Sequence, residues 1–198
     1  MVRRVPFQSL IRAGPVRVMA LVAALSALAS AGRAFGAPRV TLVKDIYPGL
    51  FESAPMGLTR VGKTVFFRAH DPAHGSQLWK SDGTRAGTKL VRVIHRGSPR
   101  FGAELGDLTR ASGMLFFVAY DGVHGYELWR SDGTRLGTRR LTRAPHRGPG
   151  NLANVGGTLF FSLSSRGPGN DAELWKSDGT RSGTKLVRPR LSNAAPGF

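Results

Sequence analysis

The chain has 198 residues, with 29 lysine and arginine side chains against 12 aspartate and glutamate side chains and a formal net charge of +17. This length suits one domain of ordinary size and excludes a large multidomain enzyme. The absence of cysteine excludes a disulfide framework, a thiolate zinc site and a cysteine nucleophile. Hydrophobic residues make up 41% of the sequence, enough for a buried core, and 26 glycines with 12 prolines predict many tight turns.

Residues 1–37 have the pattern of an export signal. Arginines without any acidic residue come first, and an uncharged run rich in alanine and leucine follows from Val18 to Gly32. This run is shorter than the roughly 18 apolar residues of a membrane-spanning helix, which favours a cleaved signal helix over an uncleaved anchor or a buried core helix. Small residues place the cleavage site after Ala31 or after Gly36. We therefore expect export, with no stable membrane span after cleavage.

Three segments of the remaining chain repeat one pattern. The block Glu-Leu-Trp-x-Ser-Asp-Gly-Thr-x-x-Gly-Thr occupies residues 77–88, 127–138 and 173–184, with Gln77 replacing glutamate in the first copy. A second block that ends in Phe-Phe precedes each copy. Blocks in a fixed order at this spacing indicate a repeat architecture. The residues we expect to be structural in this motif are Trp79, Asp82, Gly83, Trp129, Asp132, Gly133, Trp175, Asp178 and Gly179.

Each repeat predicts a four-stranded antiparallel meander. Glycine-containing two-residue turns are expected to join the first two strands, and the Asp-Gly pairs supply the turn before the fourth strand. No segment after residue 37 shows a sustained helical period, so we expect an all-β fold over residues 38–198. The expected units are complete meanders at about 57–94, 107–143 and 151–188, the outer strand of a preceding meander at 40–46, and the start of a truncated next repeat at 189–198.

Adjacent apolar residues such as Phe66 and Phe67 point to opposite faces of a strand, so both faces of each sheet must be covered. A radial stack of four-stranded sheets covers both, and about 40 to 50 residues is the usual length of a propeller blade. We therefore predict a β-propeller-like array of three blades. Closed propellers have typically about 4 to 8 blades, so the array is open or incomplete and its edges predict self-association.

The motif resembles the ELWxxDGT repeat of bacterial secreted and surface proteins. The resemblance covers residues 40–198; Gln77, a longer loop at 164–171 and the end of the chain after three repeats are departures from it. It implies a propeller-like fold and a bacterial protein that is secreted or located at the cell surface, with the periplasm as an alternative. It supplies no set of catalytic residues.

The repeated Asp82, Asp132 and Asp178 allow two interpretations. Calcium needs six to eight oxygen ligands, and each loop offers one aspartate. An Asx-turn, in which the carboxylate accepts backbone hydrogen bonds, explains the Ser-Asp-Gly-Thr sequence without a ligand. We therefore expect no metal and no cofactor, with calcium binding as the alternative.

Trp79, Trp129 and Trp175 are expected to be buried between blades, and sugar-stacking platforms are the alternative. The pair His70 and Asp71 has no nucleophile beside it, and no glycine-rich loop opens a helix to bind phosphate. We therefore expect no catalytic residues and no enzymatic activity.

Arg85, Arg135 and Arg181 occupy the same loop position in the three repeats, and Lys80, Arg130 and Lys176 directly follow the tryptophans. In a propeller, residues in one register lie on the same side of successive blades, so we expect Arg85, Arg135 and Arg181 to form a rim for an anionic ligand. A merely solvated basic surface is the alternative. Export and the lack of a recognised nucleic-acid module make nucleic acid an unexpected partner.

Together these features predict an exported, non-enzymatic repeat protein. We expect it to act as an interaction or structural module that binds a surface or matrix protein or an acidic polysaccharide. The alternatives are a fragment of a propeller-type glycan hydrolase or lyase and a truncated gene product without function.

Overall fold

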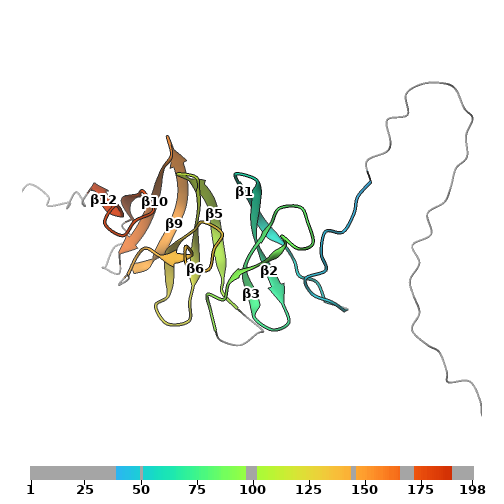
Figure 1. Cartoon of the computed structure of the whole chain (residues 1–198). Coiled ribbons are helices and arrows are strands. Elements are labelled where there is room, and N and C mark those ends of the chain that lie inside the picture. Colours follow the sequence, from blue (N-terminus) through green and yellow to red (C-terminus); the bar gives the residue numbers. More distant parts are fainter. Residues whose placement is uncertain (1–38, 50, 97–101, 144–145, 166–171, 189–198) are drawn as a thin grey trace, which may run out of the picture. The chain divides into compact units, whose positions relative to one another are not determined.

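The computed structural model describes residues 39–49, 51–96, 102–143, 146–165 and 172–188 (Figure 1). The expected signal at 1–37, with its cleavage sites, and the expected start of a further repeat at 189–198 lie outside the described residues. Every regular element in the described part of the chain is a β-strand. A search of these same residues finds no helix with the length and apolar character that a membrane crossing requires.

Twelve described strands form three open, four-stranded antiparallel sheets, each made by one repeat. The first sheet contains β1 (Met56–Val61), β2 (Thr64–Asp71), β3 (Gly75–Ser81) and β4 (Lys89–Arg92). The second contains β5 (Leu105–Ala111), β6 (Met114–Tyr120), β7 (Tyr126–Ser131) and β8 (Arg139–Arg140). The third contains β9 (His146–Val155), β10 (Thr158–Ser165), β11 (Ala172–Ser177) and β12 (Lys185–Arg188). The predicted all-β class and the three meanders are confirmed.

Two-residue turns join the first two strands of each sheet. Val61 pairs with Thr64 in the first sheet, and the equivalent residues pair in the other two. In the third turn Gly156 and Gly157 have φ values of 57° and 90°. Tight hairpin turns need such positive φ angles because they match the twist of the strands, and glycine adopts them without steric cost.

Adjacent residues in the central strands face opposite sides of each sheet. Phe66 packs in a cluster shared with the second sheet, whereas Phe67 packs with Trp79 on the other side. Side chains alternate along a strand, so each Phe-Phe pair makes both faces of its sheet apolar. We call the side that carries Phe66, Phe116 or Phe160 the forward face of its sheet, and the side that carries Phe67, Phe117 or Phe161 the backward face.

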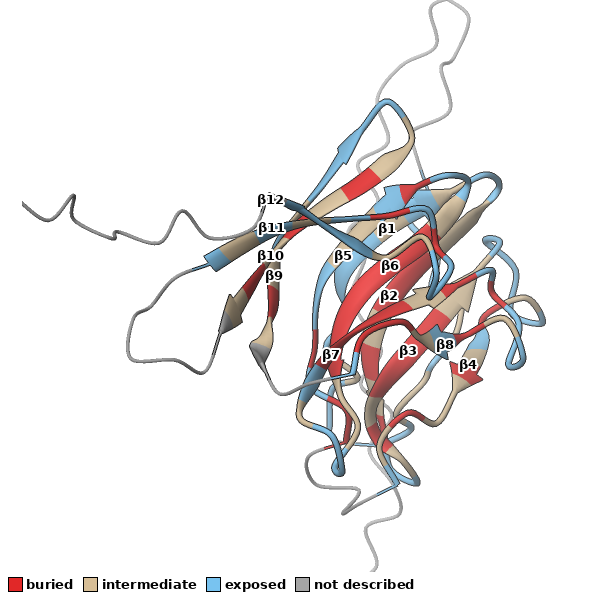
Figure 2. Cartoon of the chain, turned by 90° about the vertical axis from the view of Figure 1, so that its left-hand side faces the viewer, coloured by how far each residue is buried: buried red, intermediate tan, exposed pale blue. Residues whose placement is uncertain are grey.

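Two hydrophobic cores lie between successive sheets, and Figure 2 shows the buried strands in red. The first core joins the forward face of the first sheet to the backward face of the second and includes Phe66, Leu78, Leu115, Phe117 and Trp129. The second core joins the second and third sheets in the same way and includes Phe116, Leu128, Leu159, Phe161 and Leu163. The second sheet is therefore covered on both faces.

The first strands of successive sheets lie side by side. β1 contacts β5, and β5 contacts β9. A threonine hydroxyl bridges each pair: Thr59 Oγ1 donates to the backbone oxygen of Leu108 at 3.1 Å, and Thr109 Oγ1 to that of Leu152 at 3.5 Å. The same contact thus recurs one repeat later, which fixes the relative position of neighbouring sheets.

Residues 40–46, which were expected to be the outer strand of a preceding sheet, form no strand within one chain. A strand shares its backbone hydrogen bonds with a neighbour, and none of the described strands pairs with this segment. The segment instead lies against the backward face of the first sheet. Ile46 packs on Phe67 and Trp79, and Lys44 Nζ donates to the backbone oxygen of Thr88 at 2.7 Å.

Burial of Leu128 predicts a large effect of its truncation. Leu128 is 0% exposed, whereas Leu136 in the loop that follows the same strand is 79% exposed. Leu128→Ala should lower the free energy of unfolding by about 2 to 5 kcal/mol because it leaves a cavity. Leu136→Ala, the control at an exposed leucine, should lower it by less than about 1 kcal/mol. Urea denaturation measures both, and equal losses would contradict the proposed packing.

Candidate functional site

The motif loop after the third strand is held by its own polar side chains. In the second sheet, Asp132 Oδ1 accepts hydrogen bonds from the backbone nitrogen and the hydroxyl of Thr134, both at 2.7 Å. Thr134 Oγ1 accepts from the nitrogen of Gly137 at 2.9 Å, and Ser131 Oγ lies 2.8 Å from Thr138 Oγ1. The same bonds occur at residues 81–88 and 177–184. The expected Asx-turn is thus present in all three loops.

Steric constraints explain why two positions of this loop are glycine. Gly133 has a φ of 89°, which residues with a Cβ rarely adopt. A Cβ on Gly137 would lie 2.0 Å from the Asp132 carboxylate, so any side chain would displace the group that closes the turn. The spacing Asp-Gly-Thr-x-x-Gly therefore follows from the geometry of the loop.

The carboxylates of the loops are occupied by internal hydrogen bonds. The hydroxyl of Thr84, followed by its backbone nitrogen, holds the pKa of Asp82 below its ordinary value, and Thr180 does the same for Asp178. Burial raises the pKa of Asp132, but the backbone and side-chain hydrogen bonds from Thr134 outweigh this effect, so the pKa is below its ordinary value. Within the described ranges, no group of three or more His, Asp or Glu side chains is placed to hold a metal ion.

Trp129 and Trp175 lie at the interfaces between sheets, whereas Trp79 packs with Phe67 against the segment that precedes the first sheet. Trp79 and Trp129 are 7% and 6% exposed. A cation of the preceding segment lies over each ring: Lys44 Nζ is 5.8 Å from the Trp79 ring centre, and the Arg92 guanidinium is 5.9 Å from that of Trp129. Trp175 is partly buried and its Nε1 donates to Glu173 at 3.1 Å. This burial favours a packing role of Trp79 and Trp129 over sugar stacking, which requires an open ring face.

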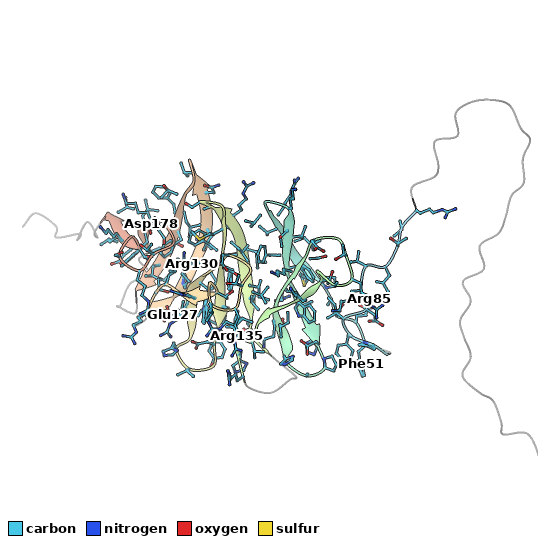
Figure 3. The ribbon with its side chains drawn as sticks, viewed as in Figure 1. Phe51, Arg85, Glu127, Arg130, Arg135 and Asp178 are labelled. Carbon is cyan, nitrogen blue, oxygen red and sulfur yellow. The ribbon has the colours of Figure 1, made fainter. Side chains whose placement is uncertain are left out.

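The side chain of the first motif residue holds, by hydrogen bonds, the segment that follows the outer strand of its sheet. Gln77 Oε1 accepts from the backbone nitrogen of Ile94 at 2.9 Å, and its Nε2 donates to the oxygen of His95 at 2.9 Å. In the second sheet the hydroxyl of Thr142 donates to the buried carboxylate of Glu127, which Figure 3 labels. Gln77 therefore replaces glutamate while keeping a hydrogen-bonding role.

Two basic grooves open beside the second sheet. The first basic groove has a volume of about 740 Å³ and the second about 750 Å³. Arginines of the first are Arg92, Arg96 and Arg135. Arginines of the second are Arg92, Arg130, Arg139, Arg140 and Arg181. Asp121 is the one carboxylate in either lining, so positive charge dominates both grooves.

Backbone oxygens orient several of these arginines. Arg92 Nη1 donates to the oxygen of Thr138 at 2.7 Å, and Arg139 Nε to that of Leu136 at 2.7 Å. Arg181 Nε donates to the oxygen of Arg140 at 3.4 Å. A guanidinium has five N–H donors, so these contacts position each side chain and leave donors for a ligand.

The acidic residue of the grooves is already paired. Asp121 accepts from the nitrogens of Val123 and His124 and lies 2.8 Å from His124 Nδ1 and 3.5 Å from Arg140 Nη1. Burial raises its pKa, but the bonds from the backbone of His124 and Val123 outweigh that effect and lower it overall. The carboxylate therefore stays charged and neutralises only part of the surrounding arginine charge.

Sequence reasoning missed this Asp-x-x-His turn. Asp71 and His74 form the same contact in the first sheet at 2.9 Å, whereas His70, singled out with Asp71, stacks on Tyr47 instead. The repeated Asp-x-x-His-Gly at 71–75 and 121–125 carried the signal. The grooves could not be found from one repeat, because the lining of the first comes from two sheets and that of the second from three.

Arg85, Arg135 and Arg181, which were expected to form one rim, do not line a common groove in the structure. All three side chains are exposed. Arg135 lines the first basic groove and Arg181 the second, while Arg85 lines neither. Figure 3 labels Arg85 and Arg135 on their separate sheets. The shared register therefore places these two arginines in two adjoining grooves, which share Arg92, Asp121 and Trp129, and leaves Arg85 outside both.

Comparison of the chain with protein-family models, curated proteins and solved structures found no match. Its function is therefore inferred from its residues and their geometry.

Substitution of Gly137 tests the motif loop. Gly137→Ala should lower the free energy of unfolding by about 1 to 3 kcal/mol, because the new Cβ displaces a charged hydrogen-bond acceptor. Gly106→Ala is the control, since nothing lies within 4 Å of a Cβ at that position. Thermal denaturation of both variants measures the effect, and a neutral Gly137→Ala would show that the loop is not closed by Asp132.

Acid should remove the contribution of Asp132 to the stability of the folded state. Because its pKa is lowered in the folded state, the stabilisation is fully present above the ordinary pKa of aspartate and is lost as the pH falls through the folded value. The difference in melting temperature between the wild type and Asp132→Asn should be largest near pH 7 and shrink below about pH 4. Glu52→Gln, an exposed carboxylate outside the motif loops, serves as the control. A difference that does not vary with pH would contradict this account.

Proposed function

We propose that the protein is an exported, non-enzymatic interaction module of a bacterial surface or matrix, which binds an acidic polysaccharide in its basic grooves. The observation that carries this proposal is the lining of the two grooves, where arginines face one paired carboxylate. The sequence pattern of residues 1–37, which predicts an export signal, supports a ligand outside the cytoplasm.

A propeller-like arrangement of the sheets is part of this proposal. It is supported by the side-by-side first strands β1, β5 and β9 and by the repeated contact between a forward and a backward face. In a propeller the first strand of each blade lies nearest the axis, and loops of equal register lie on one side. The basic grooves would then recur once per pair of neighbouring blades.

The chemistry of the grooves suits carboxylate or sulfate groups on a chain. Guanidinium binds such groups through two parallel hydrogen bonds, and its weak hydration lowers the cost of leaving water. Several arginines beside one another suit a ligand that repeats its charge, as an acidic polysaccharide does. The positive field also draws such a chain from a distance, and salt weakens this attraction.

Repetition favours a binding role over a catalytic one. The exposed polar residues of the motif loops recur from sheet to sheet, with Asp82, Asp132 and Asp178 in identical turns. Catalysis requires different groups in different roles, which breaks such symmetry. A binding module for a repeating polymer does not require this break.

Binding of an acidic oligosaccharide tests the proposal. Titration calorimetry on the full chain with oligogalacturonate should show binding that weakens between about 0.05 and 0.5 M salt. Dextran oligosaccharides of similar length, which are neutral, should not bind. Arg135→Ala and Arg181→Ala should each reduce the affinity by about fivefold to tenfold.

Arg110→Ala is the control for both variants, because Arg110 is exposed, lies outside the motif loops and lines neither groove. It should change the affinity by less than about twofold. Equal losses from all three variants would indicate attraction by net charge alone. Binding of dextran, or no binding of oligogalacturonate at low salt, would reject the proposed ligand.

A further inference from the structure

The forward face of the third sheet carries apolar residues that no described segment covers. Leu174 is 46% exposed, while Leu78 and Leu128 in the same position are fully buried. Phe160 is partly exposed and Lys176 is exposed. Figure 2 shows β11 and β12 mostly pale blue or tan beside the red central strands. The third sheet thus presents the surface that its two predecessors bury.

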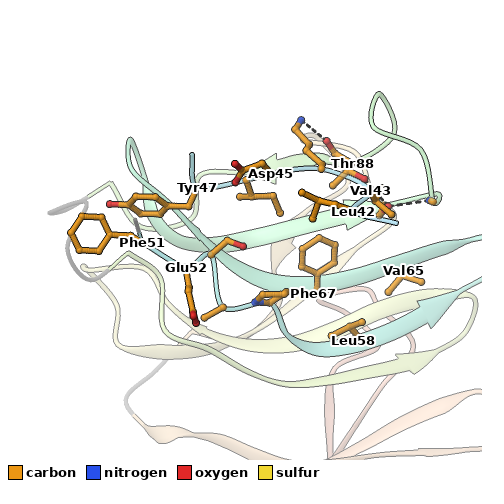
Figure 4. A pocket seen from close by; sticks show the side chains of 17 residues that line it. Leu42, Val43, Asp45, Tyr47, Phe51, Glu52, Leu58, Val65, Phe67 and Thr88 are labelled. Atoms are coloured by element: carbon orange, nitrogen blue, oxygen red, sulfur yellow. Dashed lines mark hydrogen bonds between the residues drawn. The ribbon is translucent and has the colours of Figure 1, made fainter. Parts of the chain in front are cut away.

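No described sheet covers the backward face of the first sheet, and the preceding segment buries Phe67 but leaves Leu58 on β1 exposed. A groove of about 620 Å³ lies there, with Leu58, Val65 and Phe67 on the sheet and Phe51 and Leu42 on the preceding segment (Figure 4). Leu58 is 69% exposed. Its equivalents in the other two sheets, Leu108 and Leu152, are partly buried and pack on the cores between sheets.

These two open faces are the two halves of an interface that the chain already makes twice. A Cβ on Gly133 of the second sheet would lie 3.1 Å from Phe66 of the first sheet. Lys80 Nζ of the first sheet donates to the backbone oxygen of Gly133 at 2.7 Å. A Cβ on Gly179 of the third sheet would lie 3.3 Å from Phe116. Nothing lies within 4 Å of the same position at Gly83 of the first sheet.

We propose that two copies of the chain associate head to tail, with the forward face of the third sheet of each copy on the backward face of the first sheet of the other. Phe160 and Lys176 then meet Gly83 of the partner, as Phe66 and Lys80 meet Gly133. Two copies bring six sheets together. This number lies within the range of about 4 to 8 blades that closes a ring, which ends the association at a dimer.

In this pairing, the place of the partner's outer strand, beside Trp79, is already occupied. Residues 41–44 lie there, and their sequence Thr-Leu-Val-Lys matches the Lys-Leu-Val-Arg of β12. β12 is an exposed edge strand. The partner therefore contributes β9, β10 and β11 to the interface. Either residues 41–44 or β12 of the partner fills the place of the outer strand.

Light scattering on the full chain tests the association. The mass should be that of a dimer at micromolar concentration, and Leu174→Arg should shift it to a monomer with an unchanged circular dichroism spectrum. Leu136→Arg is the control, because Leu136 is 79% exposed and lies in a motif loop away from both faces. A monomeric wild type, or a dimer that Leu174→Arg leaves intact, would overturn the proposal. A mass that rises without limit would overturn closure of the ring.

Cross-linking tests the direction of the pairing independently. Ala153 has the register of Thr59 and Thr109, whose hydroxyls lie 3.1 and 3.5 Å from the oxygens of Leu108 and Leu152. Ala153 should therefore meet Leu58 of the partner. Both are exposed and the chain has no cysteine, so Leu58→Cys with Ala153→Cys should form a covalent dimer on oxidation. Leu58→Cys with Leu136→Cys is the control, and equal cross-linking of both pairs would reject this geometry.

Discussion

Apolar residues at successive positions of the central strands impose the constraint on which the structure depends. Phe66 and Phe67, or Leu128 and Trp129, necessarily face opposite sides of one sheet. Water therefore has to be excluded from both faces, and no four-stranded sheet can do this alone. Each repeat is stable because a neighbouring repeat covers it, so stability is shared along the array.

The motif loop connects this packing to the grooves. Its internal hydrogen bonds make it rigid, and its first glycine allows the preceding sheet to approach closely, as Gly133 does with Lys80. The arginine two residues beyond that glycine then projects from a fixed position. In the second and third sheets, Arg135 and Arg181 consequently stand at grooves between neighbouring sheets. The proposed ligand sites are a product of the interface and not of one loop.

The sequence predicted the parts of the structure that one repeat determines. The meanders, the Asp-Gly turns and the opposite orientation of Phe66 and Phe67 follow from local pattern alone. The strand expected at 40–46 does not form within one chain, because a strand also needs a partner, which local pattern does not reveal. The grooves were missed for a related reason: Arg92 and Arg181 are distant in sequence and meet only through the packing of sheets. The proposed ligand and partner remain predictions.

Hydrogen exchange measures most directly whether neighbouring sheets stabilise one another. The Leu174→Arg variant keeps the forward face of the third sheet open during the experiment. We predict that amides of β6 and β7, which are covered on both sides, exchange only on global unfolding, whereas those of β11 and β12 exchange much faster. Equal protection of the second and third sheets would contradict it, because each sheet would then be stable without a covering neighbour.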